Sequence, residues 1–114
     1  MRRGQMNIEF EYRYRDWGNF KRYGAVVFQN QQSLTCEEVC QRARRALTDG
    51  QFFDASHLGI PELFFSDSPF DSDLDHGEHE FCSASETELQ ENDVPNRDIQ
   101  DFLLRMEALA VTHK

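Results

Sequence analysis

The chain has 114 residues, 39% of them hydrophobic and 29% charged, and its formal net charge is −9 at pH 7. This length suits one domain with one core, and ten phenylalanines supply that core with bulky side chains. No apolar run approaches the roughly 20 residues of a membrane-spanning helix, which argues against an integral membrane protein.

The N-terminus and the cysteines indicate where the chain resides. Polar and charged residues follow Arg2 and Arg3, at the place where a signal peptide has its apolar stretch, so we expect a cytoplasmic protein. Cys36, Cys40 and Cys82 are an odd number of cysteines, which does not suit the disulfide framework of a small secreted domain. We interpret all three as reduced, small core residues.

The first predicted element is a strand. Apolar residues at 8, 10, 12 and 14 alternate with charged residues at 9, 11, 13 and 15, which is the period of a strand with one buried face. On this pattern Tyr12 and Tyr14 point into the core, while Arg13 and Arg15 pair with neighbouring carboxylates. Turn-forming residues follow, and residues 23–28 are a second β-rich run, so the sequence predicts a hairpin.

A helix is predicted to begin after Thr35. Thr35 and Glu38 have the spacing of a capping box, and apolar residues recur after them at helical intervals. Arginines in its last turns and Gly50 as a left-handed cap predict an end near Asp49. Residues 51–55 are interpreted as extended, and a short strand is predicted over residues 62–65, with a proline just before it.

The C-terminal half is predicted to contain a strand and a helix. Residues 79–84 alternate weakly, as in a strand, and apolar residues over about 96–111 mark one stripe of a helix with Asp93 or Asn96 as its N-cap. The predicted order is β-β-α-β-β-α. We therefore expect an α+β single domain, residues 1–114, in which two amphipathic helices cover one face of an antiparallel sheet of about four strands.

Charge is segregated along the sequence. Residues 1–45 hold nine Lys and Arg against five Asp and Glu, whereas residues 46–114 hold three against sixteen. Residues 67–78 are acidic, contain Pro69 and Gly77 and lack a helical period, which predicts an acidic loop within the domain. Such segregation favours a partner of opposite charge.

We expect an acidic face to bind a basic protein, because fixed carboxylates compete for Lys and Arg that otherwise contact phosphate. By analogy of charge alone, the hypothesis is a nucleic-acid-mimicking, anti-CRISPR-like inhibitor of a basic nucleic-acid enzyme such as a bacterial defence nuclease. Arg13 and Arg15, with Lys21 and Arg22, are expected as a secondary contact. The predicted acidic contacts are Asp67, Asp71, Asp73, Asp75, Glu78, Glu80, Glu86, Glu88, Glu91 and Asp93.

The charge pattern has two other interpretations. The acidic stretch can be a solvated loop that only aids solubility. Direct binding of nucleic acid is disfavoured, because the net charge is negative and because the tyrosines and arginines of the first strand point to opposite faces.

A metal site is the alternative for the same stretch. Asp71, Asp73 and Asp75 alternate as in a calcium loop, but Gly77 is then seventh and not sixth, and Cys82 stands where a bidentate Glu belongs. The calcium template therefore fails at two diagnostic positions.

Histidines near that stretch suggest zinc or catalysis. His76, His79 and Cys82, together with His57, offer ligands for zinc, although their spacing matches no strong zinc motif. The sequence contains no nucleophile motif and no phosphate-binding Gly-rich loop, so we expect a non-enzymatic protein without a cofactor. A metal-binding or catalytic domain that uses residues 71–82 is the alternative function.

Overall fold

The computed structural model describes residues 6–15, 20–63 and 78–112. Its strands are β1 (Asn7–Arg15), β2 (Lys21–Phe28), β3 (Phe52–Phe53) and β4 (His79–Thr87), and its helices are α1 (Cys36–Ala46), α2 (Ala55–Leu58) and α3 (Ile99–Thr112). Across these ranges no helix has both the length and the apolar character that a bilayer crossing requires.

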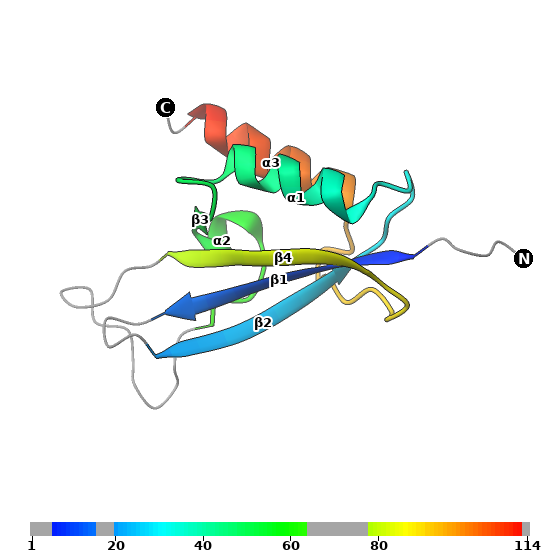
Figure 1. Ribbon diagram of the computed structural model, residues 1–114, viewed down its shortest axis with the longest axis horizontal. Coiled ribbons are helices and arrows are strands. Elements are labelled where there is room, and N and C mark those ends of the chain that lie inside the picture. The colour runs from blue at the N-terminus through cyan, green and yellow to red at the C-terminus, as the bar shows by residue number, and fades with distance from the viewer. Residues whose placement is uncertain (1–5, 16–19, 64–77, 113–114) are drawn as a thin grey trace, which may run out of the picture.

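The four strands form one antiparallel sheet in the order β2-β1-β4-β3, and the predicted α+β class is confirmed. Helices α1 and α3 lie side by side over one face of this sheet (Figure 1). The opposite face, called the open face below, is covered by no helix of the described ranges. The pairing of β1 with β4 shifts by one residue between Glu11 and Tyr12 of β1, which is a β-bulge. Cys82 of β4 is the extra residue of this bulge.

The core fills the space between the sheet and the helices. Phe10 is fully buried, and its ring centroid lies 4.9 Å from that of Phe81. Tyr12 and Tyr14 are 1% and 2% exposed, as the alternation in β1 predicts. The Tyr12 hydroxyl donates a hydrogen bond of 2.6 Å to the carbonyl of Pro61, and burial raises the pKa of Tyr12 to about 12.

Helix α1 begins as the sequence predicts. The Thr35 hydroxyl accepts the backbone N–H of Glu38 at 3.0 Å, and the Glu38 carboxylate accepts that of Thr35 at 2.8 Å, which completes the capping box. Its last residue is Ala46 and its C-cap is Leu47 in an extended conformation, so the predicted cap is wrong: Gly50 has a left-handed φ of 77° but lies in the turn that follows. The helix is therefore slightly shorter than the sequence suggested.

Helix α3 has a different cap from the one predicted. Asp98 lies directly before it and its carboxylate accepts the backbone N–H of Gln100 at 2.9 Å. Asn96 instead takes a left-handed φ of 59° in the preceding turn, and the Asp93 carboxylate accepts the backbone N–H of Arg97. Asp98 and not Asp93 or Asn96 is thus the N-cap.

The strand predicted over residues 62–65 is wrong for its described part, because residues 62 and 63 lie outside any strand. The backbone N–H of Leu63 donates to Nε2 of His79 at 2.9 Å and not to a strand neighbour. The third strand is the two-residue β3, in which Phe53 pairs with His79. One-turn helix α2, capped by Asp54, follows β3 and was not predicted.

Candidate interaction surface

The open face changes its charge along β1. Alternate residues of β1 project onto it, and these are acidic near the start of the strand and basic near its end. Glu9 pairs in register with Val27 of β2 and Ser85 of β4, whereas Arg13 pairs with Tyr23 and Glu80. Each half of the face therefore combines residues from three strands.

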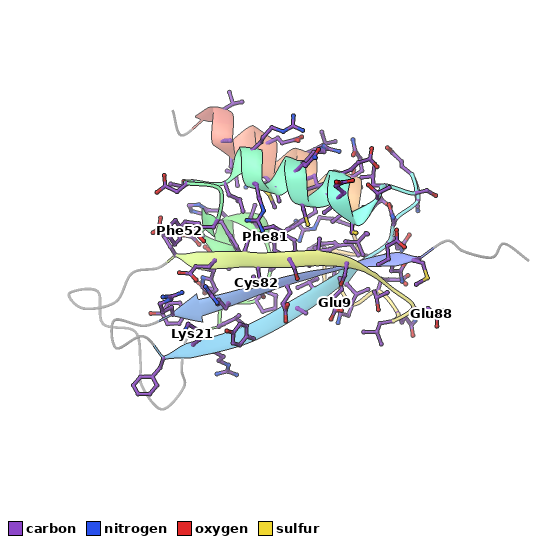
Figure 2. All side chains as sticks on the ribbon, in the orientation of Figure 1. Glu9, Lys21, Phe52, Phe81, Cys82 and Glu88 are labelled. Carbon is purple, nitrogen blue, oxygen red and sulfur yellow. The ribbon has the colours of Figure 1, made fainter. Side chains whose placement is uncertain are left out.

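The acidic half extends onto the connection between β4 and α3. This connection folds against the start of β1, since Nδ2 of Asn7 donates to the carbonyl of Leu89 at 2.8 Å. Glu9 and Glu88 both lie towards the end of the sheet where β4 ends, far from Lys21 (Figure 2). We use the name acidic end for the carboxylates of Glu9, Glu11, Glu86, Glu88 and Glu91.

No cation of the described residues is paired with the acidic end. Its carboxylates form no ion pair with any residue of the described ranges. Their partners are neutral, since Ser83 Oγ donates to Glu11 at 3.3 Å and Gln29 Nε2 donates to Glu91 at 3.1 Å. Glu11, Glu86 and Glu88 are exposed, so this end presents to solvent negative charge that no described residue neutralises by an ion pair.

The other half of the open face is organised around Glu80. We use the name basic half for Arg13, Arg15 and Lys21. Oε1 of Glu80 lies 2.6 Å from Nε of Arg13 and 3.2 Å from Nη2 of Arg15, and the Glu80 side chain is only 8% exposed. The expected pairing of these arginines with carboxylates is thus confirmed.

The environment of Glu80 keeps it ionised. Burial opposes its ionisation, but the hydrogen bonds and charges of Arg13 and Arg15 outweigh burial and lower the pKa of Glu80 below its usual 4.5. One carboxylate therefore holds two guanidinium groups, and the basic half keeps a net positive charge.

The predicted acidic contacts are distributed over several places. Glu80 and Asp93 are 6% and 7% exposed, and Asp93 pairs with Arg97 at 2.9 Å, so both have internal partners. Glu78 and Glu88 flank the two ends of the nine-residue strand β4, which separates them by about 30 Å. Glu86 and Glu91 belong to the acidic end, and the other four residues of the prediction, Asp67, Asp71, Asp73 and Asp75, lie outside the described residues.

Glu9 and Glu11 were not predicted as part of the acidic interface. They join Glu86 and Glu88 only because β1 lies next to β4 in the sheet, with Glu9 paired to Ser85. Their alternation in the sequence placed them on the exposed side of a strand, but no local pattern indicated which strand would be their neighbour.

The predicted ligands of a metal do not form a cluster in the described part of the chain, where no three His, Cys, Asp or Glu side chains are placed to hold an ion. His79 is fully buried and its Nε2 accepts the Leu63 N–H. Burial raises the pKa of the Cys82 thiol, which disfavours the thiolate form that metals and electrophiles require. His57 lies on α2, and His76 is outside the described residues.

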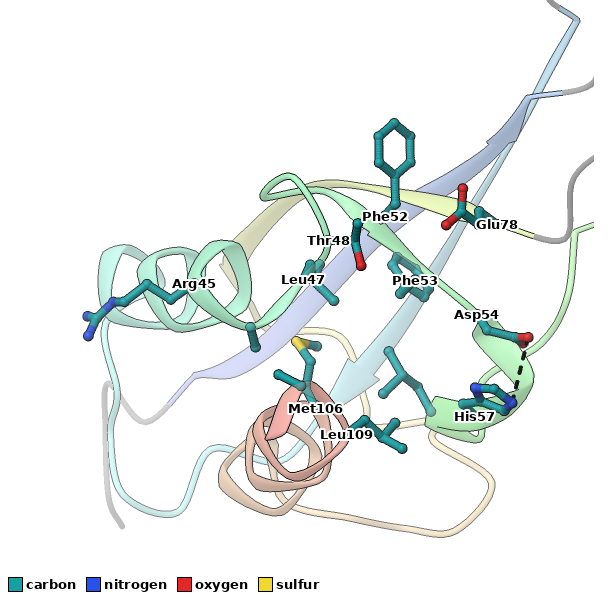
Figure 3. A pocket seen from close by; sticks show the side chains of 13 residues that line it. Arg45, Leu47, Thr48, Phe52, Phe53, Asp54, His57, Glu78, Met106 and Leu109 are labelled. Carbon is teal, nitrogen blue, oxygen red and sulfur yellow. Dashed lines mark ion pairs between the residues drawn. The ribbon is translucent and has the colours of Figure 1, made fainter. Parts of the chain in front are cut away.

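A groove of about 430 Å³ opens between the ends of α1 and α3, α2 and β3 (Figure 3). Its floor is apolar and includes Leu47, Phe53 and Met106. At its rim, Nε2 of His57 lies 3.8 Å from Oδ2 of Asp54, and this is an ion pair when the imidazole is protonated. The volume is within the range of small-molecule sites.

No protein-family model matches this chain, and no curated protein and no solved structure matches it either.

Proposed function

We propose that the protein is a non-enzymatic binding protein whose acidic end engages a basic surface on a nucleic-acid-binding protein and competes with nucleic acid for it. The observation that carries this proposal is the absence, within the described ranges, of any ion pair to the five carboxylates of the acidic end. Carboxylates that have no internal cation remain available to an external one.

The placement of the carboxylates supports binding to a surface with several cations. Glu9 and Glu11 are alternate residues of one strand, so their side chains leave the same face about 7 Å apart. Lys and Arg side chains that contact successive phosphates can instead contact such a row of carboxylates. Opposite fields also increase the rate of association, and this increase falls with salt.

The test is affinity capture with two charge variants that each remove four negative charges. The first carries Glu9→Gln, Glu11→Gln, Glu86→Gln and Glu88→Gln. The matched control carries Glu37→Gln, Asp49→Asn, Glu62→Gln and Asp101→Asn, which are exposed carboxylates elsewhere on the molecule without ion pairs in the described ranges. Wild type and both variants are used as bait, washed at increasing salt, and the retained proteins are identified by mass spectrometry.

The proposal predicts that wild type and the control variant retain the same nucleic-acid-binding protein, that the first variant loses it, and that added DNA or RNA releases it. Equal retention by both variants would mean that net charge and not the acidic end determines binding. A partner that is released by a metal chelator and not by salt would favour the metal-binding alternative.

A further inference from the structure

The groove between α1, α2, α3 and β3 has walls that are tied to one another. Nε of Arg105 on α3 donates to the carbonyl of His57 on α2 at 3.2 Å, and Nη2 of Arg42 on α1 lies 2.9 Å from Oε1 of Glu107 on α3. The three helices are therefore held around the groove by side chains of the protein itself. A ligand that enters such a preformed site does not have to order its walls, which lowers the cost of binding.

The floor of the groove consists of apolar core residues. Leu47, Phe53, Leu58 and Met106 line it and are 2–8% exposed. The flexible thioether chain of Met106 adjusts to the shape of what lies against it. With a volume of about 430 Å³, the groove accommodates an alkyl chain, whose apolar surface is then removed from water. The floor therefore selects an apolar body but not the charge of a head group.

The charges at the ends of the groove select the head group. Asp54 and Glu78 lie at the same end, whereas the guanidinium of Arg45 lies at the other end and is directed away from Leu47 and Met106 (Figure 3). The end that carries Asp54 and Glu78 is therefore acidic. It attracts a cation and repels an anion.

Asp54 is placed to contact such a cation. Burial opposes its ionisation, but the hydrogen bonds from Ser56, together with the neighbouring His57, outweigh burial and lower the pKa of Asp54. Both hydrogen bonds from Ser56 are to Oδ1, at 2.6 Å and 3.0 Å. Oδ2 lies 3.8 Å from Nε2 of His57, which is too long for a hydrogen bond. The Asp54 side chain is 40% exposed, so its carboxylate is accessible to an ammonium group.

We propose that this groove binds a small amphipathic cation, such as an alkylammonium ion, whose chain lies on Phe53 and Met106 and whose ammonium group contacts Oδ2 of Asp54. Burial of the chain supplies most of the affinity, and the hydrogen bond from the ammonium group to the carboxylate supplies the selectivity for a cation. The groove is separate from the acidic end, and neither proposal depends on the other.

Three probes share one n-octyl chain and differ in the head group: octylammonium, octanol and octanoate. Each is titrated into the isotope-labelled full chain at about pH 7.5, where the ammonium and the carboxylate are both ionised, and amide shift changes give the dissociation constant and the location. Ala110→Phe places a ring in the groove, and Ala108→Phe is its matched control at an exposed position of α3. Asp54→Asn keeps a capping side chain and removes the charge, with the exposed Asp49→Asn as its control.

The proposal predicts that wild type binds octylammonium with a dissociation constant of about 1 mM or lower, and octanoate at least about tenfold more weakly. The largest shift changes should fall on residues that line the groove. Ala110→Phe should weaken the binding of octylammonium by about tenfold, and Ala108→Phe by less than about twofold. Asp54→Asn should weaken it by about threefold, as for a partly exposed ion pair, and leave the binding of octanol unchanged.

No binding of octylammonium, or equal or tighter binding of octanoate, would overturn the proposal. The largest shift changes on the acidic end would overturn it as well, because the probe would then be attracted only by net negative charge. These outcomes are read from wild type and do not depend on whether Ala110→Phe folds. Equal effects of Asp54→Asn and Asp49→Asn would overturn Asp54 as the contact of the ammonium group.

Discussion

The acidic end and the basic half lie towards opposite ends of the sheet and differ in how their charges are balanced. In the basic half, the carboxylate of Glu80 is buried and contacts both Arg13 and Arg15. In the acidic end, Glu11 and Glu91 accept hydrogen bonds from neutral groups, and none of the five carboxylates forms an ion pair with a described residue. We therefore expect the charges of the basic half to stabilise the fold, and those of the acidic end to contribute little to it and to be available for binding.

Removal of the Glu80 charge should have the largest effect on stability. Glu80→Gln leaves two guanidinium groups without their shared carboxylate, and we expect a loss of about 2 kcal/mol in the free energy of unfolding, since the arginines are partly exposed. Thermal denaturation should show a decrease in Tm of about 8 °C. Glu86→Gln is the control and should change the free energy by less than about 0.5 kcal/mol. Similar losses of unfolding free energy for Glu80→Gln and Glu86→Gln would contradict the claim that charges of the basic half stabilise the fold more than those of the acidic end.

Acid should destabilise the protein through Glu80. The pKa of Glu80 is lower in the folded chain than the usual 4.5, so as the pH falls Glu80 is protonated first in the unfolded chain. The stabilisation that ionised Glu80 provides is therefore fully present above pH 4.5 and is lost as the pH falls through the pKa of the folded chain. The pKa of Glu107 is also lowered, mainly by its hydrogen bond to Arg42, so protonation of Glu107 in acid decreases the free energy of unfolding as well. Denaturant unfolding between about pH 6 and pH 3 should show a smaller decrease for Glu80→Gln than for wild type. Parallel pH profiles would indicate that Glu80 does not cause the decrease.

Asn92 should contribute more to stability than any side chain of the acidic end. Asn92→Ala removes the acceptor for the backbone N–H of Val27, whose side chain is 3% exposed, and should cost about 1 kcal/mol in urea unfolding. An unchanged midpoint of unfolding would show that water replaces the Asn92 amide at no cost.

Neutralisation of the acidic end should have the smallest effect on the fold. The variant with Gln at positions 9, 11, 86 and 88 loses only repulsion among exposed carboxylates, so its free energy of unfolding should equal that of wild type or exceed it by up to about 0.5 kcal/mol at low salt. Salt should remove the difference. A loss of more than about 1 kcal/mol would mean that these carboxylates have a structural role.

The elements that the sequence predicted correctly are those with strong local signals. The alternation in β1 correctly predicted the burial of Tyr12 and Tyr14, and the capping box correctly predicted the start of α1. The third strand was misplaced because β3 is only two residues long and is defined by its pairing with β4, which no local pattern encodes. The same limit applies to the acidic end, since its members meet only through the register of β1 with β4.

The N-cap of α3 shows a second kind of limit. Asp93, Asn96 and Asp98 are all residues that cap helices, and the sequence offers no reason to choose among them. In the structure, Asp93 is engaged by Arg97, whose Nη1 also donates to the carbonyl of Leu58 at 2.7 Å. A contact between residues far apart in the chain thus decides the local choice.

The most direct test of the comparison is an NMR titration of the isotope-labelled protein with a short lysine peptide, which represents a cationic partner surface. We predict that the largest amide shift changes fall on the acidic end, that they diminish between about 0.05 M and 0.5 M salt, and that the basic half changes little. Changes of equal size at Glu37, Asp49, Glu62 and Asp101, or the largest changes elsewhere on the molecule, would contradict the claim that the acidic end is the binding surface.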